Sequence, residues 1–331
     1  MIIMSNPRGC TESLNSEVGT DRRAVRCAAA RPAVAPYHQQ DKKIKITMVA
    51  RFLRGMLLCL WIGAAHGAEK TSKGYERWKA ERKVLLEDKS VIAYYDFQDE
   101  SDSIVKNWSK LGGALDGAID DDAKVHGPAW GLGRWPGKKA LQFDPGLAPT
   151  EGPDGDVPSA CFVEISPEKQ MYPLDKSKGG TGEMTFELWF KVSTLEGGWM
   201  GLVDRVSGGS ATSSPYVLWC NSGHVALFVC RLPDGKDVQV GDNESLVKGK
   251  WAHVAVTITA DRCALYRDGR LCGEAKLPGL PSDNEKPLLI GAYGRQIGLF
   301  HGWVDEMVIY NRALTEEEIQ KRAALAPEET K

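Results

Sequence analysis

The stretch Met184–Val192 reads MTFELWFKV, and it indicates the fold class of this chain. Its apolar side chains fall on every second residue, namely Met184, Phe186, Leu188, Phe190 and Val192. A period of two is that of a β-strand, because successive side chains of a strand point to opposite faces of the sheet. We therefore expect a central strand with one face packed against an apolar core.

Short apolar runs of the same kind continue on both sides of this stretch. They begin near Val91 and end near Tyr310, and turn signals such as Pro233-Asp234-Gly235 and Asp268-Gly269 separate them. No helical pattern comes between these runs, which excludes an alternating βαβ architecture with a parallel sheet. The sequence predicts an all-β fold, a two-sheet antiparallel jelly-roll sandwich.

A helix is expected at each end of this β region. Residues 68–90 place aromatic and leucine side chains at helical spacing, which predicts a leading N-terminal helix. Thr315 and Glu318 have the spacing of a capping box, which predicts the start of a short C-terminal helix. The jelly-roll domain is then expected over 91–325, with a tail at 326–331.

The N-terminal part of the chain has the pattern of an export signal. Two arginines precede an apolar run at 56–65, and Ala65-His66-Gly67 places small residues where a signal peptidase cleaves. The run is about half of the roughly 20 residues that a helix needs to span a bilayer. We therefore expect a signal peptide at 48–67, a secreted, periplasmic or cell-envelope location and no membrane span in the mature chain. Residues 1–47 are then an unstructured upstream extension, and the alternative is an uncleaved membrane anchor.

Composition and motifs exclude several classes of function. The 331 residues carry a formal net charge of -2, so the electrostatic attraction on which non-specific nucleic-acid binding depends is missing. No Walker loop, H-E-x-x-H or G-x-S-x-G motif is present. Calcium needs six to eight oxygen ligands, and the sequence does not support such a site, since the Asp120-Asp121-Asp122 run is interpreted as solvated. We expect no cofactor and no nucleic-acid partner.

Several segments, in their order along the chain, resemble the laminin-G-like, concanavalin A-like jelly-roll domains. The resemblance covers about Val91 to Ala324, and it rests on AYYDF (93–97), GKKALQFD (137–144), FVEI (162–165), MTFELWF (184–190), GKWAHVAVT (249–257), LYRDGR (265–270) and WVDEMVIYNRAL (303–314). The leading segment also resembles ectodomains of bacterial envelope proteins. The resemblance implies a non-catalytic binding or adhesion module with a glycan or protein ligand.

The same fold also hosts glycosidases, which need two carboxylates flanking the scissile bond. Glu183 and Glu187 are four residues apart, about 13 Å along a strand, whereas a retaining pair is about 5.5 Å apart. Asp305 and Glu306 are adjacent in a strand, so we expect their side chains on opposite faces. His253 is interpreted as a structural sheet histidine. We therefore expect no catalytic residues, and two alternatives stay open: a glycoside hydrolase and a structural envelope protein that docks to partner subunits.

Aromatic residues in loops are the remaining signal for a binding site. Sugar-binding modules stack pyranose rings on exposed aromatic rings beside polar groups. Trp130, Trp135 and Trp199 lie in glycine-rich segments and Tyr293 follows an expected strand, so these four are the candidate ligand-binding residues. The alternative is that such rings fold back onto the sheet edges.

Two cysteines flank the turn at Asp268-Gly269. A two-residue hairpin loop would place Cys272 opposite Leu265 and Cys263 one diagonal away, at about 7 Å. This separation is at the edge of disulfide reach, so Cys263 and Cys272 are the candidate disulfide pair. The alternative is that both pack as small apolar side chains.

Overall fold

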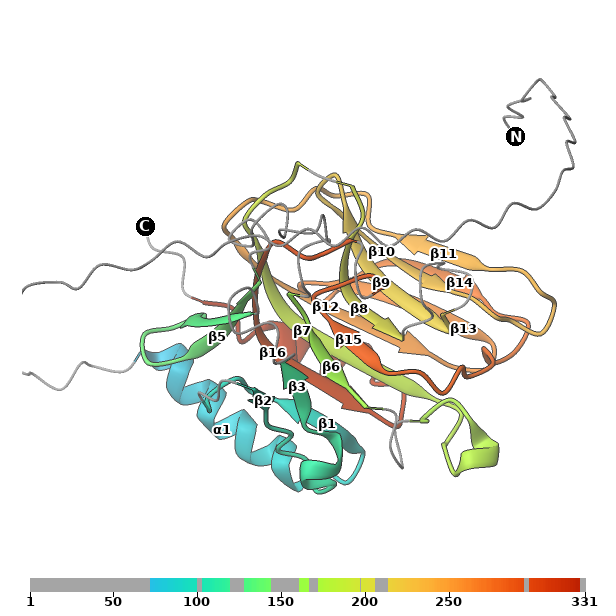
Figure 1. The fold of residues 1–331 in the computed structure, drawn as a ribbon, viewed down its shortest axis with the longest axis horizontal. Helices are drawn as coiled ribbons and strands as arrows, with labels where there is room; N and C mark the ends of the chain where they lie inside the picture. Colours follow the sequence, from blue (N-terminus) through green and yellow to red (C-terminus); the bar gives the residue numbers. More distant parts are fainter. Residues whose placement is uncertain are drawn as a thin grey trace, which may run out of the picture. The chain divides into compact units, whose positions relative to one another are not determined.

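The computed structural model describes residues 72–99, 103–119, 128–143, 161–166, 172–196, 198–205, 214–294 and 298–327 (Figure 1). The expected upstream extension, the expected signal peptide and the Asp120-Asp121-Asp122 run lie outside the described residues. No helix within the described part of the chain has the length and apolar character needed to cross a bilayer.

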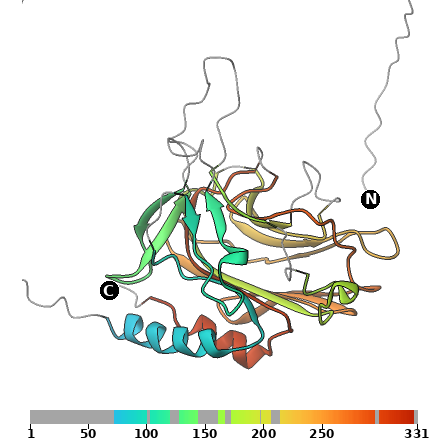
Figure 2. The ribbon, with the colours of Figure 1, turned by 60° about the horizontal axis from the view of Figure 1, so that its bottom comes forward.

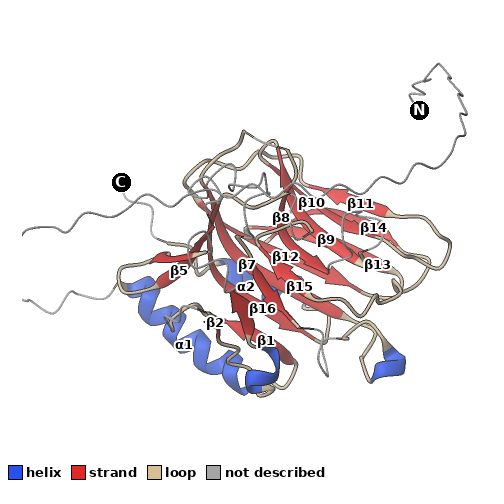
Figure 3. Cartoon of the chain, in the orientation of Figure 1, coloured by secondary structure: helices blue, strands red, loops and turns tan. Residues whose placement is uncertain are grey.

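Two antiparallel sheets make up most of the described chain (Figure 3). The first, sheet A, has the order β14 (Arg270–Lys276), β13 (Arg262–Arg267), β12 (Trp251–Ile258), β7 (Met184–Val192), β16 (Gly302–Tyr310), β5 (Lys139–Phe143) and β4 (Ala129–Leu132), with β1 (Val91–Tyr95) paired to β16. The second, sheet B, has the order β11 (Val238–Gly241), β10 (His224–Val229), β9 (Tyr216–Asn221), β8 (Met200–Arg205), β15 (Leu288–Ile290), β6 (Val163–Ile165), β3 (Gly117–Ile119) and β2 (Ile104–Val105). The predicted two-sheet antiparallel sandwich is confirmed.

The main core lies between the two sheets. The alternating apolar side chains of β7 all belong to it, as predicted, and each is at most 1% exposed. Phe186 of β7 stacks on Tyr216 of β9 with ring centroids 5.6 Å apart, so the inner faces of the two sheets are in direct contact. Burial of this apolar area is the main favourable term for the fold.

The outer face of sheet A is covered by two helices, α1 (Lys73–Glu87) and α2 (Glu316–Ala323). Figure 2 shows both helices along the same side of the sandwich. The predicted helices are thus confirmed, and α2 begins with the predicted capping box of Thr315 and Glu318. Because the helices lie on sheet A, the polar face of β7 is also buried, with Glu187 and Trp189 each 1% exposed.

Buried ion pairs lie between α2 and sheet A, beside apolar side chains of the helices. Arg322 of α2 contacts Glu187 of β7 at 2.5 Å and Glu306 of β16 at 3.4 Å. Burial opposes the charge of Glu187, but Arg322 and His253 outweigh it and lower the pKa of this carboxyl group to about 2. Glu187 and Glu306 are therefore structural anions of the helix–sheet interface.

Asp305 and Glu306 do not point to opposite faces, so that prediction is wrong. The register of β16 against β7 shifts between Val304 and Glu306, which is a β-bulge. As a result Arg134 binds both carboxylates, Asp305 at 2.8 Å and Glu306 at 2.6 Å. Asp305 also accepts a hydrogen bond from the backbone N–H of Arg134 at 2.8 Å, as expected for a carboxylate that binds a neighbouring loop.

The candidate disulfide bond between Cys263 and Cys272 is not formed, and both thiols are free. The register of the β13–β14 hairpin pairs Leu265 with Gly273 and Tyr266 with Leu271. Cys272 is the extra residue of this bulge and does not stand opposite Leu265. Cys263 lies in the core between the sheets, which corresponds to the alternative interpretation for that residue.

Candidate functional site

Four aromatic side chains gather on the outer face of sheet B, and we call them the aromatic cluster: Trp199, Trp219, Phe228 and Tyr293. Trp219 of β9 lies at its centre, with ring centroids 4.1 Å from Trp199, 4.1 Å from Phe228 and 5.3 Å from Tyr293. Tilted and edge-to-face contacts of this kind are the preferred geometries of aromatic pairs. Trp219 is 5% exposed whereas Trp199 is 42% exposed. The ring of Trp199 is therefore accessible to solvent and packs against the buried ring of Trp219.

Close backbone packing fixes the two chain segments that carry Trp199 and Tyr293. The carbonyl of Gly298 accepts hydrogen bonds from the N–H groups of Gly201 at 2.7 Å and Tyr293 at 3.1 Å. A Cβ at Gly201 would lie 2.1 Å from the backbone of Ala292, so only glycine permits this approach. Trp199 and Tyr293, far apart in the sequence, are thereby held beside each other.

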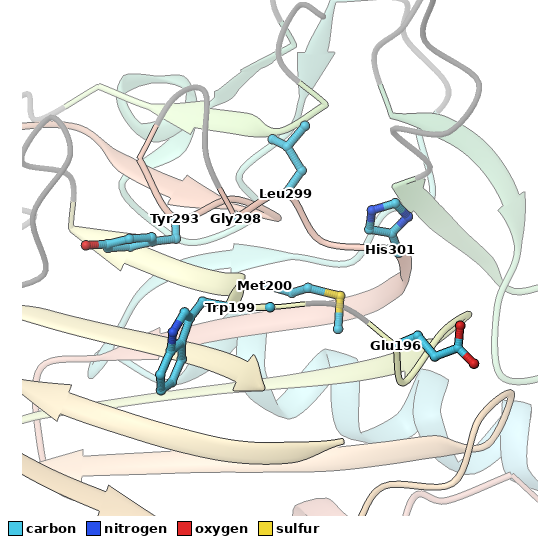
Figure 4. A pocket seen from close by; sticks show the side chains of 8 residues that line it. Glu196, Trp199, Met200, Tyr293, Gly298, Leu299 and His301 are labelled. Atoms are coloured by element: carbon cyan, nitrogen blue, oxygen red, sulfur yellow. The ribbon is translucent and has the colours of Figure 1, made fainter. Parts of the chain in front are cut away.

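A pocket of about 440 Å³ lies beside these two residues, lined by Glu196, Gly198, Trp199, Met200, Tyr293, Gly298, Leu299 and His301. Figure 4 shows Trp199 and Tyr293 at one side of the pocket, Glu196 and His301 at the other, and Met200 between them. This volume is in the range of pockets that take small ligands. An aromatic wall opposite polar groups is an arrangement that can bind a ring with one apolar face and polar substituents.

A buried carboxylate supports the Tyr293 side of the pocket. Asp204 of β8 is 1% exposed. It accepts hydrogen bonds from the N–H of Gly294 at 2.9 Å and from the hydroxyl of Ser214 at 2.8 Å. Burial raises the pKa of Asp204 to about 6, although both hydrogen bonds act in the opposite direction. The residue that follows Tyr293 is therefore tied directly to β8.

The structure brings together two of the four residues that were predicted to bind ligand. Trp199 and Tyr293 line the same pocket. Trp130 lies on strand β4 of sheet A and not in a loop, so its predicted location is wrong, and it packs against the main core. Trp135 is 3% exposed, which corresponds to the alternative that such a ring folds back onto the protein. A Cβ at Gly74 of α1 would lie 2.2 Å from its indole nitrogen, which shows that the leading helix packs directly on this ring.

Sequence reasoning did not identify Trp219 and Phe228 as parts of the site. Both lie in strands whose two faces are apolar, so alternation does not tell the core face from the outer face. The pairing of Val217 with Phe228 and of Trp219 with Ala226 puts all four on the outer face. The available signal was the presence of two large rings in consecutive strands joined by the short turn Ser222-Gly223.

The sheet carboxylates Glu187, Asp305 and Glu306 are all buried. Glu187 and Glu306 both contact the guanidinium group of Arg322, but each carboxylate residue is only 1% exposed. Their position beneath the helices leaves no room for a substrate. His253 is also fully buried, and its Nε2 lies 3.2 Å from Glu187, as expected for a structural sheet histidine. Across the described residues, no group of three or more His, Cys, Asp or Glu side chains is placed to hold a metal ion.

A second hollow, of about 920 Å³, lies beside the end of α2. Two buried arginines line it, and both are engaged in ion pairs: Arg134 binds Asp305, and Arg267 binds Asp242 and Glu244. These contacts stabilise the protein itself. The pocket beside Trp199 is the better candidate, because an exposed ring lines it.

Comparison with known proteins finds a family model that matches part of the chain. Residues 170–320 match the family model described as the concanavalin A-like lectin/glucanases superfamily. No curated protein sequence matches the chain. Among solved structures, the binding domain of Paraclostridial Mosquitocidal Protein 1 is similar with a TM-score of 0.51 at 16% identity, covering 71% of this chain and 52% of that one.

A second similar structure is the binding domain of botulinum neurotoxin serotype D. Its TM-score is 0.50 at 13% identity, and the match covers 71% of this chain and 51% of that one. At these identities the similarity establishes the fold alone. The chain matches about half the length of each of these two solved structures.

Proposed function

We propose that this chain, whose residues 170–320 match the model of the concanavalin A-like lectin/glucanases superfamily, is a carbohydrate-binding module that acts without catalysis and without a cofactor. The observation that carries the proposal is the pocket that Trp199 and Tyr293 line on the outer face of sheet B. The binding domains with the same fold support a binding role, and the buried carboxylates of sheet A argue against hydrolysis.

Stacking of a sugar ring on Trp199 makes the largest contribution to the free energy of binding. The C–H face of a pyranose is apolar and fits an indole face, while the hydroxyl groups at the ring edge bind polar side chains. Trp219 holds the Trp199 ring from behind at 4.1 Å, so the side chain loses little conformational freedom when a ligand binds. Glu196 and His301 lie on the opposite side of the pocket, where they can meet the hydroxyl groups.

Export is the second part of the proposal. The arginines before the apolar run and the small residues at Ala65 and Gly67 support cleavage that leaves a mature chain starting near Ala68. Mass spectrometry of the protein recovered outside the cytoplasm tests this directly. A mature N-terminus near Ala68 is expected, and an intact Met1 or Met48 start on the recovered protein would contradict it.

Calorimetric titration with a panel of neutral oligosaccharides tests the binding function. We expect Trp199→Ala to weaken binding about tenfold or more, since truncation of an aromatic side chain that carries much of the contact costs more than about 1 kcal/mol, and about 1.4 kcal/mol is tenfold in affinity. Tyr293→Ala should weaken binding in the same direction. Trp130→Ala removes an indole from the other sheet and should leave affinity unchanged.

Two outcomes would contradict the binding proposal. The first is hydrolysis of a polysaccharide by the wild type that is lost in Glu187→Gln, which would establish a glycoside hydrolase. The second is the absence of binding to every glycan together with a stable hetero-complex in pull-down experiments, which would establish a structural envelope component.

A further inference from the structure

Two carboxylates lie at or near the pocket beside Trp199. Among its described lining residues, Glu196 is the one with a formal charge at neutral pH, and no lysine or arginine is present. A second carboxylate, Asp204, lies behind the Tyr293 side, where it binds the N–H of Gly294 at 2.9 Å. Two carboxylates near a small pocket produce a negative potential there, and the low dielectric around the buried one reduces screening.

The arginine next to Asp204 in the sequence has other partners. Arg205 is 1% exposed. Its guanidinium group lies 3.5 Å from Asp283 and 5.2 Å from the centre of the Tyr172 ring. The groups that act on the Asp204 carboxyl are the N–H of Gly294 and the hydroxyl of Ser214, with no cation among the described residues. The charge of Asp204 is therefore not cancelled by an ion pair within the described chain.

The aromatic rings of the pocket act in the same direction as the carboxylates. The face of an indole or phenol ring carries a partial negative charge, so it attracts a cation and repels an anion. Trp199 is 42% exposed and Tyr293 stands beside it, which leaves ring surface available to a ligand. A ligand with a compact positive charge next to an apolar ring face would satisfy both features of the pocket.

We propose that the pocket formed by Trp199, Tyr293 and Glu196 selects sugars that carry a protonated amine, of the glucosamine type, over neutral sugars and excludes acidic ones. The inference rests on the proposed carbohydrate-binding function and names its ligand class. In the bound state the pyranose face stacks on Trp199, and the ammonium group lies toward the carboxylate of Glu196.

Calorimetric titration with three matched oligosaccharides tests the inference, using oligomers of glucosamine, of N-acetylglucosamine and of glucuronic acid. At about pH 6.5 and low salt, we expect the glucosamine oligomer to bind about tenfold more tightly than the neutral oligomer, and the acidic oligomer to bind most weakly. The preference should shrink as salt is added, because ionic strength screens the exposed charge of Glu196.

Charge-neutral variants separate the charge effect from stacking. Glu196→Gln should reduce affinity for the glucosamine oligomer about three- to tenfold and should reduce affinity for the neutral oligomer less, because the amide can still bind a hydroxyl group but carries no charge. Glu316→Gln, at an exposed position of α2, is the matched control and should change neither affinity. Trp199→Ala should weaken binding of both oligomers.

The outcomes distinguish this inference from the proposed function. Equal affinity of the wild type for the amine-bearing and neutral oligomers, with both lost in Trp199→Ala, would overturn the amine preference and leave the carbohydrate-binding function intact. Tighter binding of the acidic oligomer would also overturn it. No binding of any of the oligosaccharides, in this experiment and in the panel of neutral oligosaccharides, would count against the proposed function itself.

Discussion

Asp204 is a buried carboxylate whose ionisation opposes folding. Burial raises the pKa of Asp204 to about 6 in the folded chain, whereas an unperturbed aspartate titrates near 3.8. When the folded pKa of an acid is raised, its protonated form is favoured by the fold. The contribution of Asp204 to stability is thus fully present below the unfolded pKa and is lost as the pH rises through about 6. Burial raises the pKa of Tyr216 and Cys230, and the charge of Asp204 acts on both groups in the same direction.

Asp204→Asn is expected to stabilise the protein at neutral pH. The amide oxygen can still accept from the Gly294 N–H, and the amide nitrogen can donate to the Ser214 hydroxyl. We expect a gain on the order of 2 kcal/mol in the free energy of unfolding above about pH 7, which disappears below about pH 4. Urea unfolding across this pH range measures it, with the exposed Asp237→Asn as control. An equal effect at both ends of the pH range would contradict the account.

At the scale of elements, buried polar contacts attach the two helices to sheet A, as ion pairs from α2 and as a hydrogen bond from α1. Arg322 joins α2 to Glu187 of β7 and Glu306 of β16, and the indole N–H of Trp78 on α1 donates to Glu306 at 3.0 Å. The gain from a buried ion pair over apolar residues is small, but removing one partner leaves an uncompensated buried charge. This interface is therefore sensitive to the loss of a single cation.

Arg322→Met should destabilise the protein by about 3–5 kcal/mol at neutral pH, because Glu187 and Glu306 then lose a cation in a buried interface. Lys321→Met, on the same helix but 63% exposed, removes only a surface ion pair and should cost less than about 1 kcal/mol. Urea unfolding of the two variants gives the comparison. Similar losses for both would show that the ion pairs of Arg322 do not hold α2 on the sheet.

The elements differ in how far the sequence predicts them. Strand β7 and the capping box of α2 follow from spacing alone, and both are confirmed. The bulges at Asp305 and at Cys272 were not predicted. One extra residue in a strand cannot be recognised from the alternation of apolar and polar residues alone. The burial of Trp135 depends on where α1 docks, and local spacing does not contain that information.

The candidate site was predictable in part. Trp199 and Tyr293 stand out because each lies beside glycines next to a strand, and the structure places them in one pocket. Their shared location depends on the approach of Gly201 to the backbone of Ala292, which is a tertiary contact. The supporting role of Trp219 depends on which face of sheet B meets the core.

At the scale of the whole sandwich, the two sheets have different outer faces. Helices α1 and α2 bury the outer face of sheet A, including the carboxylates of β7 and β16 (Figure 2). The described residues place no helix on the outer face of sheet B, which carries the aromatic cluster. Because helices cover the outer face of sheet A, the outer face of sheet B is the better candidate for contact with a ligand.

The indole N–H resonances in an NMR titration with an oligosaccharide test the central claim most directly. If the pocket beside Trp199 binds sugars, the Trp199 signal should shift with increasing ligand, while the signals of Trp130 on β4 and Trp78 beneath α1 stay in place. Shifts confined to Trp130, or no shift at Trp199 at saturating ligand, would contradict the account.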